Sequence, residues 1–141
     1  NYDEISKFIK KYEKIYSIIL IPDSDQPDLP MKTESDLSNI GFAAAYNPGI
    51  RLGLYQKAFL NFFPDGGPFE LVLYSSNINY IFFKNLSNSI IYDDKIPTKF
   101  LYDKNNQFRW ANKFQYVHDL DCNKNENMSN IFETYLKKIN D

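Results

Sequence analysis

Turn-forming residues recur at short intervals between residues 41 and 117, and this spacing limits the folds that the chain can adopt. Asn47-Pro48-Gly49 and Pro64-Asp65-Gly66-Gly67 are typical of tight connections between strands. The runs between the turns are rich in aromatic and β-branched residues, which favour strands. These runs are Phe42–Tyr46, Ile50–Tyr55, Ala58–Phe63, Phe69–Tyr74, Ile78–Phe83, Ser89–Tyr92, Thr98–Tyr102 and Gln107–Val117. The pattern predicts a single antiparallel sheet, a meander of about six to seven strands.

One segment of this meander has two readings. Between Leu52 and Phe63 the large apolar residues also fit one stripe of a helix. We favour a strand, because apolar and other residues alternate from Ile50 to Leu54 and turn signals close both ends of the segment.

The two ends of the chain have helical periodicity. From Asp3 to Tyr16, apolar residues recur at steps of three and four with lysines between them. Near the other end, Ser129 is a plausible N-cap, and an apolar stripe runs from Ile131 to Ile139. We therefore expect an α+β fold in which an N-terminal and a C-terminal helix flank the sheet, packed on one of its faces.

Length and composition bound the remaining choices. The chain has 141 residues, which suits one globular domain over residues 1–141. Its 12 Phe, 11 Tyr and 1 Trp can supply most of a core. The net charge is −2, which argues against a nucleic-acid partner. No apolar run is long enough to span a bilayer, so we expect a soluble, cytoplasmic protein without a membrane partner.

The residues from His118 to Cys122 form the one local cluster that could carry metal or thiol chemistry. His118, Asp119, Asp121 and Cys122 would need further ligands or a base from elsewhere, and the chain has no second His or Cys. We favour a strand end that runs into a polar loop, and expect neither a metal nor another cofactor. Glu70 could face a pocket from its predicted strand, but an outward position is favoured.

Aromatic residues such as Trp110 and Tyr116 could act as stacking platforms for bases or sugars. Binders of single strands combine such platforms with a positive groove. Arg51 and Arg109 are the only arginines in the chain. Core packing is therefore the favoured role of the aromatic residues.

An acidic segment lies between the first helix and the predicted sheet. Prolines prevent regular structure there, and the segment from 23 to 36 carries a net charge of −4. Its spacing does not match a calcium-binding EF-hand loop. We expect the segment to bind a partner through its carboxylates, which are Asp23, Asp25, Asp28, Glu34 and Asp36.

These features favour a protein-binding module over an enzyme, and we assign no catalytic residue. Small acidic single-domain proteins of this kind often act as specific inhibitors, such as the immunity proteins that neutralise bacterial toxins by covering a basic active site. The expected partner is thus a protein with a basic surface, a cognate toxin and possible nuclease. Two alternatives stay open: an accessory domain of a larger secreted or viral assembly, and an enzyme whose site is assembled from distant residues.

Overall fold

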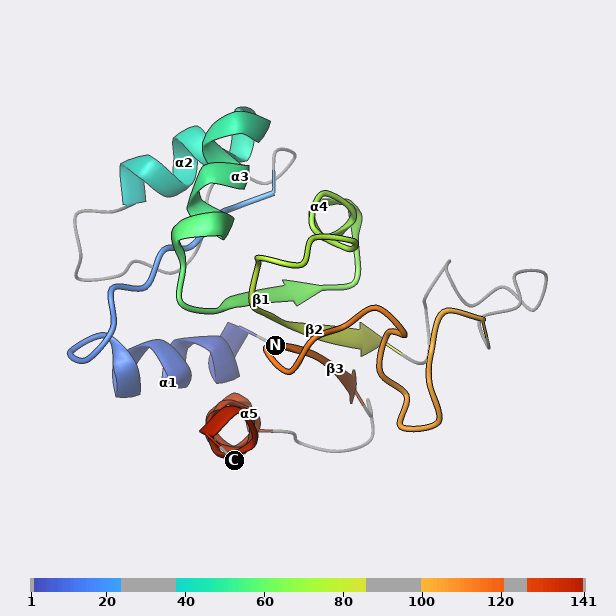
Figure 1. Ribbon diagram of the computed structural model, residues 1–141. Helices are drawn as coiled ribbons and strands as arrows, with labels where there is room; N and C mark the ends of the chain where they lie inside the picture. Colours follow the sequence, from blue (N-terminus) through green and yellow to red (C-terminus); the bar gives the residue numbers. More distant parts are fainter. Residues whose placement is uncertain (1, 24–37, 86–99, 121–126, 141) are drawn as a thin grey trace. The chain divides into compact units, whose positions relative to one another are not determined.

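The computed structural model describes residues 2–23, 38–85, 100–120 and 127–140 (Figure 1). Five helices and three strands follow one another in this part of the chain. They are α1 (Tyr2–Tyr12), α2 (Ser38–Tyr46), α3 (Pro48–Lys57), β1 (Asn61–Pro64), α4 (Gly67–Glu70), β2 (Tyr80–Asn85), β3 (Gln115–Leu120) and α5 (Met128–Asn140). The longest described helix, α5, has 13 residues, and none of the described helices has the length and apolar character of a membrane span.

The predicted sheet is wrong, although the α+β class holds. The described strands form one three-stranded sheet of order β1-β2-β3, and both pairings are parallel, so there is no meander of six to seven antiparallel strands among them. A hairpin turn cannot join parallel strands, since the chain must first return to the starting end of the sheet. The connection from β1 to β2 therefore contains the predicted strand Phe69–Tyr74.

Both terminal helices are confirmed, with small shifts at their ends. α1 ends at Tyr12 rather than Tyr16. Lys137 and Lys138 lie in the last turn of α5, where positive charge suits the helix dipole. At the start of α5, the Asn127 side chain accepts a hydrogen bond from the Ser129 N–H at 2.8 Å. Asn127, not Ser129, therefore provides the side-chain cap.

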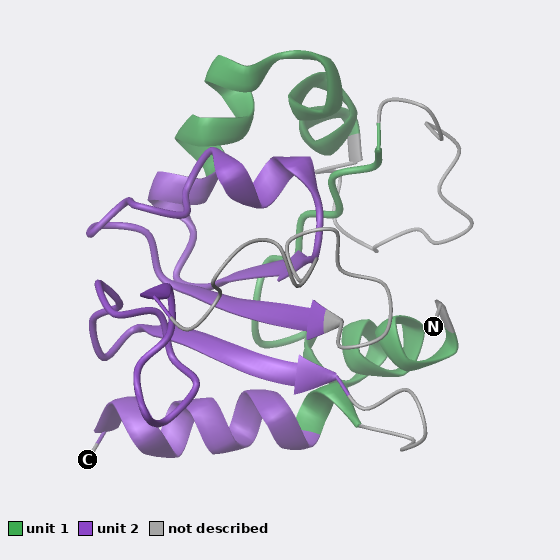
Figure 2. Ribbon diagram, turned by 90° about the vertical axis from the view of Figure 1, so that its right-hand side faces the viewer, with its two compact units in different colours: residues 1–54, 127–129 green, residues 55–126, 130–141 purple. Residues whose placement is uncertain are grey.

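The chain divides into two compact units (Figure 2). Unit 1 comprises residues 1–54 and 127–129, and unit 2 comprises residues 55–126 and 130–141. The prediction of one domain over residues 1–141 stays a prediction.

In unit 1, the predicted strands Phe42–Tyr46 and Ile50–Tyr55 are helices, α2 and α3. Asn47-Pro48-Gly49 forms a helix start rather than a hairpin turn. The Asn47 Oδ1 accepts hydrogen bonds from the N–H groups of Gly49 and Ile50 at 2.9 and 3.1 Å, and Pro48 is the first residue of α3. An Asn cap followed by Pro at the first helical position is a standard way to begin a helix. Three consecutive alanines in α2 also favour a helix.

In unit 2, the sheet has two faces that are covered by different segments. Residues paired across parallel strands point to the same face, so Phe63, Phe82 and Val117 share one face, and Phe62, Phe83 and His118 share the other. The second face contacts α5, where the rings of Phe62 and Phe132 lie 6.2 Å apart. On the first face, Phe69 of α4 and Phe108 pack against Phe82.

The residues predicted as the strand Phe69–Tyr74 fold into the end of α4 and the turns that follow it. Phe69 is 3% exposed and stacks on Phe82 of β2, with 4.1 Å between ring centroids. Phe108 packs on both rings at 5.8 Å. These aromatic contacts form the core of unit 2 and attach the connecting segments to the sheet.

The other predicted strands are placed only in part. Ile78–Phe83 overlaps β2, Ala58–Phe63 overlaps β1, and only the end of Gln107–Val117 belongs to β3. From Thr98–Tyr102, the described residue Tyr102 makes an isolated antiparallel bridge with Phe108. Ser89–Tyr92 lies outside the described residues.

Candidate functional site

Only one residue of the predicted acidic binding segment is described. Asp23 is exposed and lies outside any helix or strand. Asp25, Asp28, Glu34 and Asp36 lie outside the described residues. The assignment of this segment to a partner therefore stays a prediction.

The two described residues of the cluster from His118 to Cys122 do not point toward a common site. His118 and Asp119 are consecutive residues of β3, so their side chains point to opposite faces of the sheet. The His118 ring contacts Phe83 at 6.0 Å, whereas Asp119 approaches Lys84. Asp121 and Cys122 lie outside the described residues. Among the described residues, no group of three or more His, Cys, Asp or Glu side chains could hold a metal ion.

The other residues considered from the sequence have packing or solvent roles. Glu70 is exposed at the end of α4, not in a strand. Trp110 lies between Phe108 and Tyr74, with centroids 5.1 and 4.7 Å away, and its indole N–H donates to the Leu73 carbonyl. Tyr116 lies under the Lys138 ammonium at 4.4 Å. Trp110 is therefore half-buried and packs between the core ring of Phe108 and the ring of Tyr74, which is 71% exposed.

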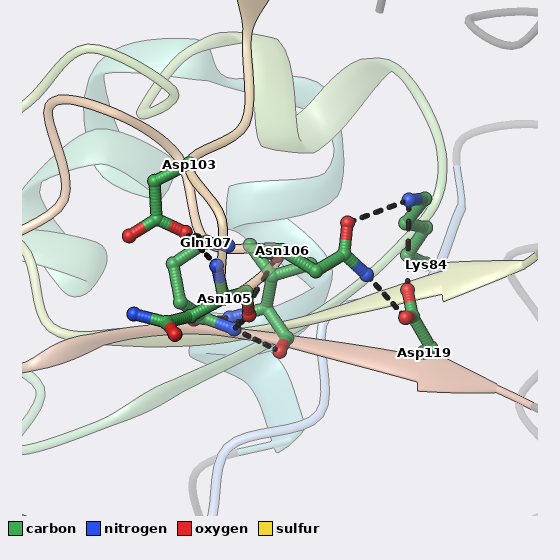
Figure 3. A network of polar contacts seen from close by, with 7 residues as sticks. Lys84, Asp103, Asn105, Asn106, Gln107 and Asp119 are labelled. Atoms are coloured by element: carbon green, nitrogen blue, oxygen red, sulfur yellow. Dashed lines mark hydrogen bonds and ion pairs between the residues drawn. The ribbon is translucent and has the colours of Figure 1, made fainter. Parts of the chain in front are cut away.

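A polar network that the sequence analysis missed lies near the carboxyl ends of β2 and β3 (Figure 3). Lys84 and Asp119 are directly paired across the two strands, and Lys84 Nζ lies 3.6 Å from Asp119 Oδ1. The Asn106 side chain joins them, since its oxygen accepts from Lys84 at 3.2 Å and its nitrogen donates to Asp119 Oδ2. Lys84 is only 7% exposed, and its ammonium also lies 4.3 Å from the Tyr102 ring centroid.

The loop that presents Asn106 is held by Asp103. The Asp103 carboxylate accepts hydrogen bonds from the N–H groups of Asn105 and Gln107 at 2.8 and 2.9 Å. These bonds, the one from Gln107 first, lower the pKa of Asp103 below its usual range. Asn106 itself has a φ of 60°, a left-handed conformation that asparagine tolerates better than most residues.

The network fastens this loop to the sheet. Open parallel sheets often bind ligands at the carboxyl ends of their strands. Here, however, the ammonium of Lys84 and both groups of the Asn106 amide are used within the network. Asp119 Oδ1, which is buried, faces Lys84 but accepts no hydrogen bond from the described residues. The sequence does not show that residues 84, 106 and 119 are neighbours in space. The one local signal is Lys84, a charged residue at the end of an apolar run.

Unit 1 presents a different kind of candidate, an exposed aromatic surface on α2 and the start of α3. Phe42 and Tyr46 lie one helical turn apart, are 50% and 54% exposed, and contact each other edge to face at 5.2 Å. Ile50 follows at the same interval of four residues and is 41% exposed. We call Phe42, Tyr46 and Ile50 the α2–α3 surface.

Arg51 holds the two helices that carry this surface. Its Nε donates to the Ala44 carbonyl at 2.9 Å, and its Nη2 donates to the Ala45 carbonyl at 3.2 Å. These carbonyls lie in the last turn of α2, where no further helical N–H is available. The guanidinium therefore stabilises the end of α2 from within α3.

Comparisons of the chain with protein-family models, curated proteins and solved structures found no match.

Proposed function

We propose that this chain is a protein-binding module that recognises its partner through the α2–α3 surface and inhibits it. The observation that carries this proposal is the exposure of Phe42 and Tyr46, side by side on a helix. Large rings left in water form the centre of many protein interfaces, where they supply most of the binding energy.

The two helices present these rings with little freedom. The cap by Asn47 and the Arg51 hydrogen bonds to Ala44 and Ala45 hold the junction of α2 and α3 from both sides. A surface that is ordered before binding loses less conformational entropy when the complex forms. This favours recognition by contact with a preformed surface.

The acidic segment supplies the second element of the proposal. It ends at residue 36, shortly before Ser38, the first residue of α2, and carries a net charge of −4. Exposed carboxylates attract a basic protein over a distance comparable to the Debye length, about 10 Å at 0.1 M salt. The partner that fits both features has an apolar recess within a basic surface, as a toxin with a cationic active site would have.

The test uses the purified product of the gene immediately upstream as the binding partner. Phe42→Ala together with Tyr46→Ala should weaken binding by at least about 30-fold, because a single interface anchor already contributes about 2 kcal/mol or more. Phe59→Ala is the matched control, since Phe59 is 54% exposed but lies in unit 2. Equal binding of all variants would reject the α2–α3 surface. Inhibition of the partner's activity should fall in parallel with binding.

The role of the acidic segment is tested separately, by association kinetics. Replacing Asp25, Asp28 and Asp36 with Asn removes three of the five carboxylates, so association with the same partner should slow and should depend less on the salt concentration. The melting temperature should change little, because surface substitutions usually alter stability by about 0.5 kcal/mol or less. If the triple variant associates as fast as the parent chain, the acidic segment takes no part in recognition.

A further inference from the structure

Among the described strands, β3 lies at one edge of the sheet, and half of its backbone groups point away from β2. The N–H of Tyr80 in β2 donates to the carbonyl of Phe114, the residue before β3. The backbone N–H and C=O groups of the even-numbered residues of β3 therefore face β2. The N–H and C=O of Val117, an odd-numbered residue, therefore face outward. Such groups on an edge strand form a template on which another strand can pair.

The side chain of Gln107 occupies this position on the edge. Its oxygen accepts the Val117 N–H at 2.7 Å, and its nitrogen donates to the Val117 C=O at 3.0 Å. One amide thus makes both hydrogen bonds that a neighbouring strand would make to Val117. The Asp103 carboxylate holds the backbone of Gln107, as Figure 3 shows.

We propose that Gln107 caps the β3 edge and that the strand it excludes is β3 of a second copy of this chain. Two copies related by a two-fold axis through Val117 would pair antiparallel. Val117 would lie opposite its own equivalent, and Tyr116 would lie opposite His118 of the second copy. Tyr116 and His118 lie on one face of β3, with ring centroids 6.3 Å apart, so this register would place each Tyr116 ring across from the His118 ring of the other copy. The outward N–H of Gln115 already donates to the Asn112 carbonyl at 3.1 Å, so the part of the edge that becomes self-complementary once the amide is removed is centred on Val117.

Gln107→Ala tests the proposal, and Gln56→Ala is the matched control, because Gln56 is an exposed glutamine of α3. Sedimentation velocity over a range of protein concentrations measures self-association. The Gln107 variant should self-associate at least about tenfold more tightly than the parent, because two copies can then exchange hydrogen bonds at Val117. The Gln56 variant should behave as the parent chain does.

Hydrogen exchange at single amides tests the capping role of Gln107 independently of the pairing with a second copy. In the Gln107 variant, measured at low concentration, the Val117 amide should exchange faster, whereas the Tyr116 amide, which faces β2, should keep its rate. An unchanged Val117 rate would overturn the cap. Faster exchange without self-association would overturn the second copy as the occupant. If Gln107→Ala does not fold, Gln107→Met keeps the length of the side chain and removes both hydrogen bonds, with the same expected results.

Discussion

Unit 2 and the α2–α3 surface of unit 1 use the same aromatic residue types in opposite ways. In unit 2, Phe69, Phe82 and Phe108 are buried and pack against one another across the face of a sheet. On α2, Phe42 and Tyr46 are about half exposed and contact each other. A high aromatic content therefore indicates neither a core nor an interface, because the neighbours of each ring decide which of the two it serves.

The polar contacts of the two units differ in how far apart in the sequence their partners lie. In unit 2, the contacts of Lys84 and Asn106 join segments that are distant in the sequence. In unit 1, Asn47 and Arg51 bond to backbone groups of neighbouring helical turns. Unit 2 thus uses polar groups to attach a loop to its sheet, while unit 1 uses them to orient two helices that carry exposed rings.

The largest expected effect comes from a core ring. Phe69→Ala should lower the free energy of unfolding by about 3–5 kcal/mol, because the buried ring leaves a cavity among Phe63, Tyr80, Phe82 and Phe108. Phe42→Ala should cost less than about 1 kcal/mol, since its ring is already half in water. Urea denaturation of the two variants measures the difference. Equal losses would show that Phe42 is a core residue, contrary to its assignment to an exposed surface.

The parts that could be predicted from the sequence are those that depend on local periodicity. α1 and α5 have apolar stripes at helical spacing, and β2 is a short apolar run that is nearly continuous. The α2–α3 junction was misread because Asn, Pro and Gly serve both turns and helix starts. The parallel pairing was misread because the direction of a strand depends on the path of its connection, and residues 65–79 contain a short helix followed by turns.

The candidate sites were harder to predict than the fold. Lys84, Asn106 and Asp119 come together only because β2 and β3 are adjacent and the loop at residues 103–107 folds over them. The exposure of Phe42 and Tyr46 could not be read from the sequence once their segment was assigned to a strand. Of the expected binding residues, Asp23 alone is described, so the acidic segment remains a prediction.

A smaller effect is expected from the network at Lys84. Asp119→Ala should lower stability by about 2 kcal/mol, because it leaves the Lys84 ammonium buried without its carboxylate partner. Lys84→Met should cost less than about 1 kcal/mol, since an apolar chain of similar length replaces the buried charge beside Tyr102. Thermal unfolding of both variants shows which of them loses more stability. A larger loss for Lys84→Met would mean that the lysine, not the carboxylate, controls this loop.

The smallest effect concerns pH and the loop held by Asp103. Because the N–H groups of Gln107 and Asn105 lower the pKa of Asp103, its contribution to stability is present above the ordinary carboxyl pKa of about 4. This contribution is lost as the pH falls through the lowered pKa of the folded state. Asp103→Asn should therefore melt below the parent chain at neutral pH, and the two melting temperatures should converge in acid. A difference that is independent of pH would contradict the role of the carboxylate.

A hydrogen-exchange map of the chain in complex with the product of the upstream gene shows directly whether the α2–α3 surface binds the partner. Binding through the α2–α3 surface should slow the exchange of amides from Asn39 to Arg51 and leave those of β2 and β3 at their rates in the free chain. Slowed exchange confined to unit 2, with α2 and α3 unchanged, would contradict the claim and place the interface in the unit whose aromatic residues form the core.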